Sequence, residues 1–374
     1  MRTRVFVAST VFREMADHPL VSEGVRARVR RAWEKLNATC HVAEFPGRFP
    51  APSDLEEAID AGATLVGCHL SHPIPKVLLE RGPVEAVCTS TAGYDHVETP
   101  DDDSVLVTHA PGVLQRAVAD FTVTAILASL RNLLNLHEFV WSGAWSPDER
   151  WDLDQKLART VDRVTVGVVG MGEIGTEVTR RLSAWGVRLK YHDPVRRTDV
   201  EAAHPNVEYS GKLESVFSDC DVVSLHVPLT DATRGLVNAR LLKLMKPGAL
   251  LVNTSRGGVV NFDDLLDVLE SGEARVNLAF DVFDPEPIPP GVLDRFKKIQ
   301  ARKPELKFLF VPHNASADAD TRGQMAAMLL EDLATLATAQ SFEDVARARL
   351  IPRHRRDVEA GNVSRFRIGR RFGE

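Results

Sequence analysis

The stretch that decides the fold is VTVGVVGMGEIG, residues 164–175. Its β-branched run leads into Gly170, Gly172 and Gly175, which are spaced as G-x-G-x-x-G. The helical stretch EIGTEVTRRLSAW overlaps its end, and the second strand-like run, VRLKYHD, ends at Asp193, 18 residues beyond Gly175. A strand, a glycine turn, a helix and a second strand that ends in an acid predict a dinucleotide-binding unit.

Each part of such a unit has a physical role. Gly170 permits the tight turn, Gly172 lets the backbone approach a pyrophosphate, and Gly175 lets the helix pack closely on the strand. Asp193 would accept hydrogen bonds from the adenosine ribose, and its charge would repel the 2′-phosphate of NADP. We therefore predict NAD rather than NADP, although the next basic residues, Arg196 and Arg197, would offset part of that repulsion.

Working outward, strand-like runs alternate with helical stretches on both sides of this unit. RVFVAST, CHVAEF, TLVGCHL and VEAVCTS precede it, and the second series is VTVGVVG, VRLKYHD, DVVSLHV, ALLVN, VNLAFDV and KFLFVP. Such alternation predicts parallel sheets with crossover helices. A Pro-Gly break at 111 precedes a predicted apolar helix of about 20 residues, which marks a domain boundary. A second apolar helix begins near Thr321 and is placed to pack back on the first domain.

Composition narrows the class of protein. A length of 374 residues suggests two domains, and 44% hydrophobic with 26% charged residues is average for soluble globular chains. The net charge of -6 gives no general attraction to nucleic acid or anionic lipid. We expect no membrane span and no signal peptide. Four scattered cysteines without C-x-x-C spacing are typical of buried thiols in a reducing cytoplasm.

Three chemically active stretches follow strands of the second series, at the edge where such sheets bind ligands. They are VNTSRGG with Arg256, FDVFDPEP with Asp281 and Glu286, and VPHNAS with His313. Taken singly, each has a structural explanation, because loop arginines form surface ion pairs and D-P-E-P runs form turns. Their order after a dinucleotide unit favours a shared active site.

In this order the motifs resemble the D-isomer-specific 2-hydroxyacid dehydrogenase family. The resemblance runs from residue 62 to 336 and includes TAGYDHV, APGVLQRAVAD, GVVGMGEIG, YHDP, DVVSLHVPLTDAT, NTSRGGVV, AFDVFDPEP and VPHNAS. It implies an α/β fold with two doubly wound parallel sheets. A Rossmann domain, residues 111–316, would be inserted into a flavodoxin-like substrate domain, residues 1–110 and 317–345, and residues 346–374 would form an Arg-rich tail. It also implies a homodimer formed through the helix after Pro111.

The chemistry follows from the residue types. A 2-keto acid needs its carboxylate fixed and its carbonyl polarised, and the guanidinium of Arg256 grips carboxylates bidentately. A proton donor that titrates near neutrality suits the developing alkoxide, and His313 is the candidate. The resemblance assigns Glu286 as the carboxylate partner of His313. We predict NAD-dependent interconversion of a 2-keto acid, such as glyoxylate, hydroxypyruvate or a larger one, and a D-2-hydroxy acid.

The resemblance implies further contacts. The amides of Ala92 and Gly93 would hold the substrate carboxylate together with Arg256, and Asp281 would accept from the nicotinamide carboxamide. The remaining cofactor contacts would be the amides of Glu173 and Ile174 on the pyrophosphate, and Pro228, Thr233 and Thr254 along the cofactor.

Some features depart from the family pattern. NASAD follows His313 where relatives carry a glycine pair, Asn261 replaces an acid at a predicted helix start, and residues 287–312 are long and basic. CHLSH, with Cys68, His69 and His72, lacks a fourth ligand, so we expect no metal there and interpret it as a loop that touches the substrate's side chain.

Two functional alternatives stay open. Relatives of this fold also act as NAD-sensing corepressors, and an NAD-dependent formate dehydrogenase branch shares the scaffold, although Glu286 disfavours that branch, which has Gln there. Residues 341–374 hold nine arginines with interleaved Phe366 and Phe372, a pattern that can bind RNA. A solvated tail or subunit-contact arm is favoured, so no nucleic acid partner is expected.

Overall fold

The computed structural model describes residues 2–148 and 152–373, and the chain forms two compact units. Unit 1 is Met1–Leu114 with Ala317–Glu374, and unit 2 is Gln115–Ser316. Each unit is built around one parallel sheet with helices, which confirms the predicted α/β fold class. The two units are described separately below.

Unit 1 holds a five-stranded parallel sheet in the order β2-β1-β3-β4-β5, the flavodoxin-like order. The strands are β1 (Arg4–Val7), β2 (His41–Glu44), β3 (Leu65–Cys68), β4 (Ala86–Thr89) and β5 (Leu106–Thr108). The helices are α1 (Val11–Glu14), α2 (Glu23–Thr39), α3 (Pro52–Asp60), α4 (Lys76–Arg81), α13 (Ala319–Thr338), α14 (Phe342–Val345) and α15 (Pro352–Glu359), with a 3-10 turn η3 (Arg367–Arg371). Of the unit 1 strands, only β5 lies outside the strand-like runs predicted from the sequence.

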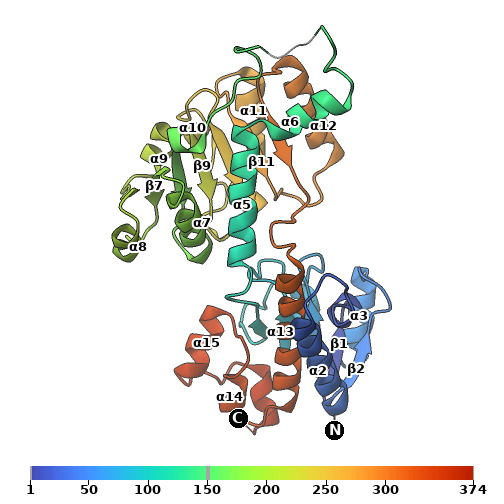
Figure 1. Ribbon diagram of the computed structural model, residues 1–374. Coiled ribbons are helices and arrows are strands. Elements are labelled where there is room, and N and C mark those ends of the chain that lie inside the picture. The colour runs from blue at the N-terminus through green and yellow to red at the C-terminus, as the bar shows by residue number, and fades with distance from the viewer. Residues whose placement is uncertain (1, 149–151, 374) are drawn as a thin grey trace. The chain divides into compact units, whose positions relative to one another are not determined.

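Helix α13 returns from the end of unit 2 and packs in unit 1, as expected from its apolar sequence. Its N-cap Asp318 accepts a hydrogen bond from the Thr321 amide at 2.8 Å. Figure 1 shows α13 beside α2, and the buried side chains of Leu330 and Leu333 share one core with Val29 of α2. A helix from the second part of the chain therefore completes the core of the first.

Unit 2 holds a seven-stranded parallel sheet in the order β12-β11-β10-β9-β6-β7-β8, which is the doubly wound Rossmann order extended by one strand. The strands are β6 (Thr165–Val169), β7 (Arg188–His192), β8 (Val207–Tyr209), β9 (Val222–Leu225), β10 (Leu250–Asn253), β11 (Asn277–Phe280) and β12 (Phe308–Phe310). The predicted six strands are all present. The seventh, β8, has three residues of which only Val207 is buried, too few to give a pattern.

The helices of unit 2 include one that differs from the prediction. They are α5 (Gln115–Leu130), α6 (Leu133–Trp141), α7 (Glu173–Ser183), α8 (Thr198–Ala203), α9 (Leu213–Asp219), α10 (Ala239–Leu242), α11 (Phe262–Ser271) and α12 (Pro290–Arg302), with 3-10 turns η1 (Val161–Arg163) and η2 (Gly257–Val259). Figure 1 shows α5 along the sheet near β11. The single apolar helix predicted after residue 111 is wrong: α5 and α6 meet at a 61° bend beside Asn132, whose φ of 54° is left-handed. Among the residues the structure describes, no single helix is long and apolar enough to cross a membrane, and only this bent pair together meets those criteria.

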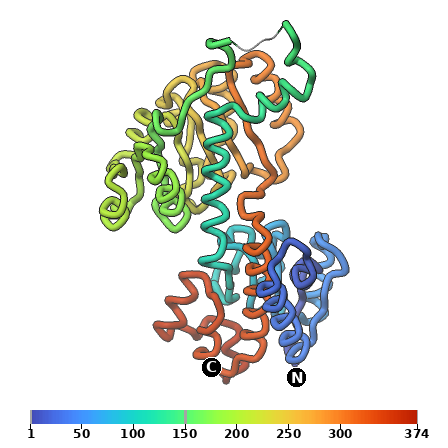
Figure 2. Tube along the Cα trace, viewed as in Figure 1, coloured from blue at the N-terminus to red at the C-terminus, as the bar shows by residue number. Residues whose placement is uncertain are grey.

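The C-terminal segment is also not the solvated tail that its charge suggested. Figure 2 shows the red end of the trace folded into the same unit as the blue N-terminal end. Phe366 and Ile368 are 2% and 0% exposed, and the guanidinium of Arg367 donates to the carbonyls of Leu79, Gly82 and Val84. The apolar residues between the arginines supply a buried face, and the arginines satisfy backbone acceptors.

Candidate active site

The predicted site residues of unit 2 gather at one edge of its sheet. Gly170 follows β6, Asp193 follows β7, Arg256 follows β10, Asp281 follows β11 and His313 comes shortly after β12. These strands are parallel, so their carboxyl ends meet at the same edge. The loop after β9 adds Pro228 and Thr233, whose hydroxyl donates to the Pro228 carbonyl at 2.5 Å.

The glycine turn has three different local geometries. Gly170 has a φ of 94°, a left-handed conformation that favours glycine, and its amide donates to the His192 carbonyl at 2.8 Å. A Cβ added to Gly175 would lie 2.1 Å from the Gly170 oxygen, so α7 approaches the turn too closely for any other residue. A Cβ on Gly172 would meet nothing within 4 Å. That open backbone precedes the first amides of α7, Glu173 and Ile174, where a pyrophosphate would fit.

The loop that carries Arg256 is held from two sides. Asn253, fully buried at the end of β10, donates from Nδ2 to the Arg256 carbonyl at 2.9 Å and accepts from the Ser255 amide at 3.0 Å. A Cβ on Gly257 would lie 1.9 Å from the Phe283 oxygen. The Arg256 loop and the loop with Glu286 therefore touch backbone to backbone. Asn253 and Gly257 were not among the predicted site residues, although a polar residue at the end of the apolar run ALLVN was a usable signal.

Glu286 and His313 are directly hydrogen-bonded. The Nδ1 atom of His313 lies 2.7 Å from Oε2 of Glu286, and Oε1 of Glu286 accepts from the Phe283 amide at 2.9 Å. Burial opposes ionisation of Glu286, but its hydrogen bond to His313 and the nearby charge of Arg256 outweigh this and hold the pKa of Glu286 below its usual value. His313 has a left-handed φ of 54°, a strained conformation of the kind found at functional sites. Arg256, Glu286 and His313 thus form one electrostatic cluster.

Comparison with known proteins agrees with this geometry. Residues 123–315 match the profile of the D-isomer specific 2-hydroxyacid dehydrogenase, NAD binding domain. A glyoxylate reductase of Thermofilum pendens is 36% identical over 305 residues, which cover 80% of this chain and 86% of the relative. A glyoxylate reductase of Aeropyrum pernix is 34% identical over 341 residues, which cover 90% of this chain and 93% of the relative.

The chain belongs to the D-isomer-specific 2-hydroxyacid dehydrogenase family. It is an NAD-dependent oxidoreductase that interconverts 2-keto acids and 2-hydroxy acids. A crystal structure of D-lactate dehydrogenase from Aquifex aeolicus, complexed with NAD and lactic acid, has the same fold, with a TM-score of 0.72, 23% identity, and coverage of 93% of this chain and 99% of that one.

In this dehydrogenase the acid at the end of β7 braces the glycine turn. Asp193 accepts from the Met171 amide through Oδ2 and from the Val195 amide through Oδ1, both at 2.8 Å. The two arginines that follow are each gripped by another carboxylate. Arg196 binds both oxygens of Glu201 at 3.0 and 2.7 Å, and Arg197 binds both oxygens of Asp199 at 2.9 and 2.7 Å.

These ion pairs bear on the choice of cofactor. The hydrogen bond from Arg197 lowers the pKa of Asp199 to about 2, so this pair is charged throughout the neutral range. Because Asp199 and Glu201 already neutralise the arginines, the charge of Asp193 stays available to repel a 2′-phosphate. The sequence had left this compensation open, and the observed pairing favours NAD.

Asp281 has a role in the dehydrogenase that the sequence did not reveal. Its carboxylate is 1% exposed and accepts from the amides of Asn314 at 2.5 Å and Ala315 at 2.9 Å, while its carbonyl accepts from the His313 amide at 2.8 Å. Burial raises its pKa above the usual value. Asp281 therefore shapes the loop that presents His313. Its contact with a nicotinamide carboxamide stays a prediction.

Thr254, expected along the cofactor, is 7% exposed and hydrogen-bonds Thr122 of α5 at 2.8 Å. Because the Thr122 hydroxyl donates to the Val118 carbonyl at 2.7 Å, it must accept from Thr254. This bond ties the Arg256 loop to α5.

In unit 1, Ala92 and Gly93 lie in the loop after β4. The Ala92 carbonyl accepts from Nδ1 of His109 at 2.9 Å, and the Gly93 carbonyl accepts from the Thr91 hydroxyl at 2.6 Å. Their role in holding the substrate carboxylate stays a prediction.

The ring nitrogens of the CHLSH histidines bond to backbone groups. Nδ1 of His72 accepts from the His69 amide at 3.3 Å, and its Nε2 pairs with the Arg48 carbonyl at 2.8 Å. Burial lowers the pKa of His69 to about 3, so its ring is neutral. This arrangement stabilises a loop and leaves His72 no free nitrogen for a ligand.

Proposed function

We propose that this chain uses NADH to reduce glyoxylate to glycolate, or hydroxypyruvate-type 2-keto acids to D-2-hydroxy acids, and that His313 is the general acid, and the general base in the reverse direction. The observation that carries the proposal is the 2.7 Å hydrogen bond between Glu286 and Nδ1 of His313 at the sheet edge that also bears the glycine turn. The names of the relatives from Thermofilum pendens and Aeropyrum pernix support glyoxylate as a substrate.

Each residue of the proposed site has its own role in the reaction. NADH supplies the hydride that reaches C2 of the keto acid. The guanidinium of Arg256 binds the substrate carboxylate and polarises the C2 carbonyl. Glu286 engages Nδ1 of His313, so Nε2 is the atom that gives a proton to the carbonyl oxygen as the C–H bond forms.

The negative charge of Glu286 explains why it is paired with His313. Because its pKa is lowered, Glu286 is ionised at neutral pH and stabilises the imidazolium of His313 before proton transfer. One hydride and one proton add to the C=O bond, and NAD and a hydroxy acid result. The amides of Ala92 and Gly93 are the further proposed ligands of the substrate carboxylate.

The test is NADH oxidation, followed by absorbance, with glyoxylate, hydroxypyruvate, pyruvate and phenylpyruvate. Turnover with one of them is expected, and His313→Ala should lower kcat by about 10²- to 10⁴-fold, the range for losing a general acid. His204→Ala, at the end of α8, is the matched control and should leave kcat unchanged. NADH binding without turnover on any acid would favour a sensing protein, and a normal kcat in His313→Ala would remove the mechanism.

We also propose a homodimer in the cytoplasm. The side chains of Leu133, Leu134, Val140 and Trp141 on α6 are 57%, 51%, 53% and 79% exposed, an apolar patch of the kind that associates. Light scattering should give twice the mass of one chain, and Trp141→Glu should reduce it to one. All four cysteines are buried thiols, which suits a reducing compartment.

A further inference from the structure

Within the C-terminal segment, residues 349–365 cover the open edge of the unit 1 sheet. Strand β5 is at that edge, and Leu350 forms an antiparallel bridge with its Thr108. The Ile351 amide donates to the Val107 carbonyl at 3.0 Å, and the His109 amide donates to the Arg349 carbonyl at 2.9 Å. The edge of β5 is therefore covered by a segment from much later in the chain, which pairs with it through an isolated bridge.

A buried histidine completes this edge. The Val107 amide donates to Nδ1 of His354 at 3.0 Å, and His354 is fully buried. Since Nδ1 is an acceptor, Nε2 carries the hydrogen and donates it to Asp103 at 3.0 Å. The imidazole thus takes the place of a backbone carbonyl in the sheet.

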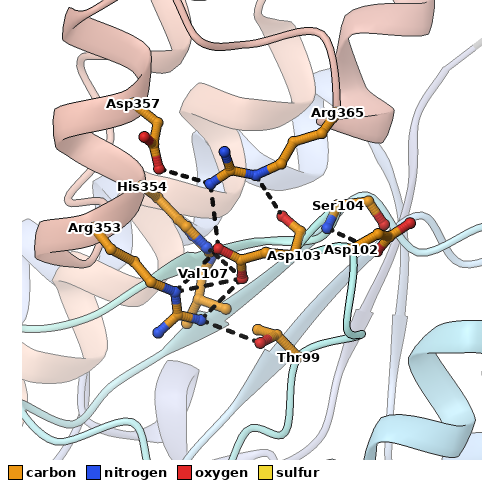
Figure 3. Close-up of polar contacts among 9 residues, drawn as sticks. All are labelled: Thr99, Asp102, Asp103, Ser104, Val107, Arg353, His354, Asp357 and Arg365. Atoms are coloured by element: carbon orange, nitrogen blue, oxygen red, sulfur yellow. Dashed lines mark hydrogen bonds and ion pairs between the residues drawn. The ribbon is translucent and has the colours of Figure 1, made fainter.

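Figure 3 shows how Asp103 gathers the segment. Arg353 donates to both carboxylate oxygens of Asp103, at 3.1 Å each, and to the Thr99 hydroxyl at 3.2 Å. Arg365 reaches the same carboxylate at 3.2 Å and pairs with Asp357 at 2.6 Å. Asp103 has a left-handed φ of 48°, which these donors maintain. Helix α15 is thereby fixed to the loop before β5.

Further contacts connect Arg353 to the loop at residues 91–94. The Arg353 guanidinium carbon lies 5.9 Å from the centre of the Tyr94 ring, and that ring meets His109 edge-on at 5.8 Å. Nδ1 of His109 donates to the Ala92 carbonyl, and the amide of Ala110 donates to the Thr91 carbonyl at 2.9 Å.

The hydrogen bonds to the Thr91 and Ala92 carbonyls fix the direction of two backbone amides. A peptide unit is planar and trans, so its N–H points opposite to its C=O. The Thr91 carbonyl shares a plane with the Ala92 N–H, and the Ala92 carbonyl shares one with the Gly93 N–H. Residues 109 and 110, which come directly after β5, therefore orient both amides proposed to hold the substrate carboxylate.

We propose that the C-terminal segment is a positioning element for the substrate-carboxylate loop, and that Arg353 and His109 are its positioning residues. This inference rests on the proposed function, since it takes Ala92 and Gly93 as carboxylate ligands. The Arg-rich end of the chain then affects substrate affinity indirectly, because it helps to fix the direction of the Ala92 and Gly93 amides.

The first experiment compares steady-state constants. Arg353→Ala should raise KM for glyoxylate by about 3- to 10-fold, the worth of one hydrogen bond, with a smaller change in kcat and an unchanged KM for NADH. Arg353→Lys, which keeps a cation near Tyr94, should fall between. The matched control is Arg356→Ala, an exposed arginine of α15, with wild-type constants. Equal changes in both KM values, or none, would overturn the inference.

His109 gives a sharper pair of variants. An asparagine side chain can place its amide nitrogen near the position of Nδ1, so His109→Asn should recover most of the affinity lost in His109→Ala. Equal KM values in the two variants would contradict the role of the Ala92 carbonyl clamp.

A second measurement needs no turnover. Amide hydrogen exchange over residues 91–97 should be faster in Arg353→Ala than in wild type and Arg356→Ala. Wild-type protein that turns over no keto acid contradicts the proposed function, whereas unchanged exchange in Arg353→Ala contradicts this inference.

Discussion

Replacing Glu286 with glutamine tests the acid–base pair without removing its shape. The two oxygens of Glu286 face two donors, the Phe283 amide at 2.9 Å and Nδ1 of His313 at 2.7 Å. Glutamine has one oxygen and one NH₂, so it can satisfy only one of them. If the oxygen stays on the Phe283 amide, the NH₂ faces Nδ1, and a protonated imidazole meets another donor.

The cost follows from that mismatch. A hydrogen bond to a charged group contributes about 1.5–3 kcal/mol. At about 1.36 kcal/mol per factor of ten, kcat/KM for keto acid reduction should fall about 10- to 160-fold. Because the loss falls on the protonated imidazole, it should be largest on the alkaline side of the pH profile. The deficit should therefore shrink as the pH is lowered.

The assay is NADH absorbance with glyoxylate across the pH range, for wild type, Glu286→Gln and a matched control. Glu270→Gln is that control, because Glu270 lies on the surface of α11, paired with Arg295 at 2.8 Å. It should reproduce the wild-type profile. A Glu286→Gln enzyme with the wild-type pH profile and the wild-type kcat/KM would refute the argument that Glu286 holds the charge of His313.

Three further changes have defined outcomes. Gly175→Ala places a Cβ 2.1 Å from the Gly170 oxygen, so NADH binding measured by fluorescence titration should be lost while the unit 1 core stays folded by circular dichroism. The carboxylate of Asp103 has a pKa well below its usual value, because its hydrogen bonds to His354 and Arg353 outweigh burial. The stabilisation from this carboxylate is present above the unfolded pKa of about 3.9 and is lost as the pH falls through the lower folded value. Asp103→Asn should therefore lower the free energy of unfolding, measured with urea, by about 1–3 kcal/mol at neutral pH. The difference from wild type should become smaller in acid. The double variant Asp199→Asn, Glu201→Gln should raise kcat/KM for NADPH relative to NADH by roughly tenfold, since it frees Arg196 and Arg197 for a 2′-phosphate. An unchanged ratio would count against neutralisation of the two arginines by these acids.

The sequence by itself determined the features that depend on local pattern. Alternating runs gave the α/β class, and the glycine spacing with Asp193 located the cofactor turn. Residues after strands were placed at one edge because parallel strands end together. Asn261, which stands at a predicted helix start, caps α11 and accepts from the Asp264 amide at 3.1 Å. The parallel sheets, the glycine turn and the helix cap are present in the structure, because each depends mainly on neighbours in sequence.

Tertiary structure decided the rest, because each remaining feature depends on a partner far along the chain. Asn132 breaks the predicted long helix, and Asp281 turns its carboxylate to the amides after His313. The arginines beyond residue 346 looked like a tail by charge, yet Arg353 meets Asp103, 250 residues away. The sequence alone does not show whether an arginine is solvated or paired with a distant carboxylate. The folded chain brings Asp103 to the edge of β5, where Arg353 binds it.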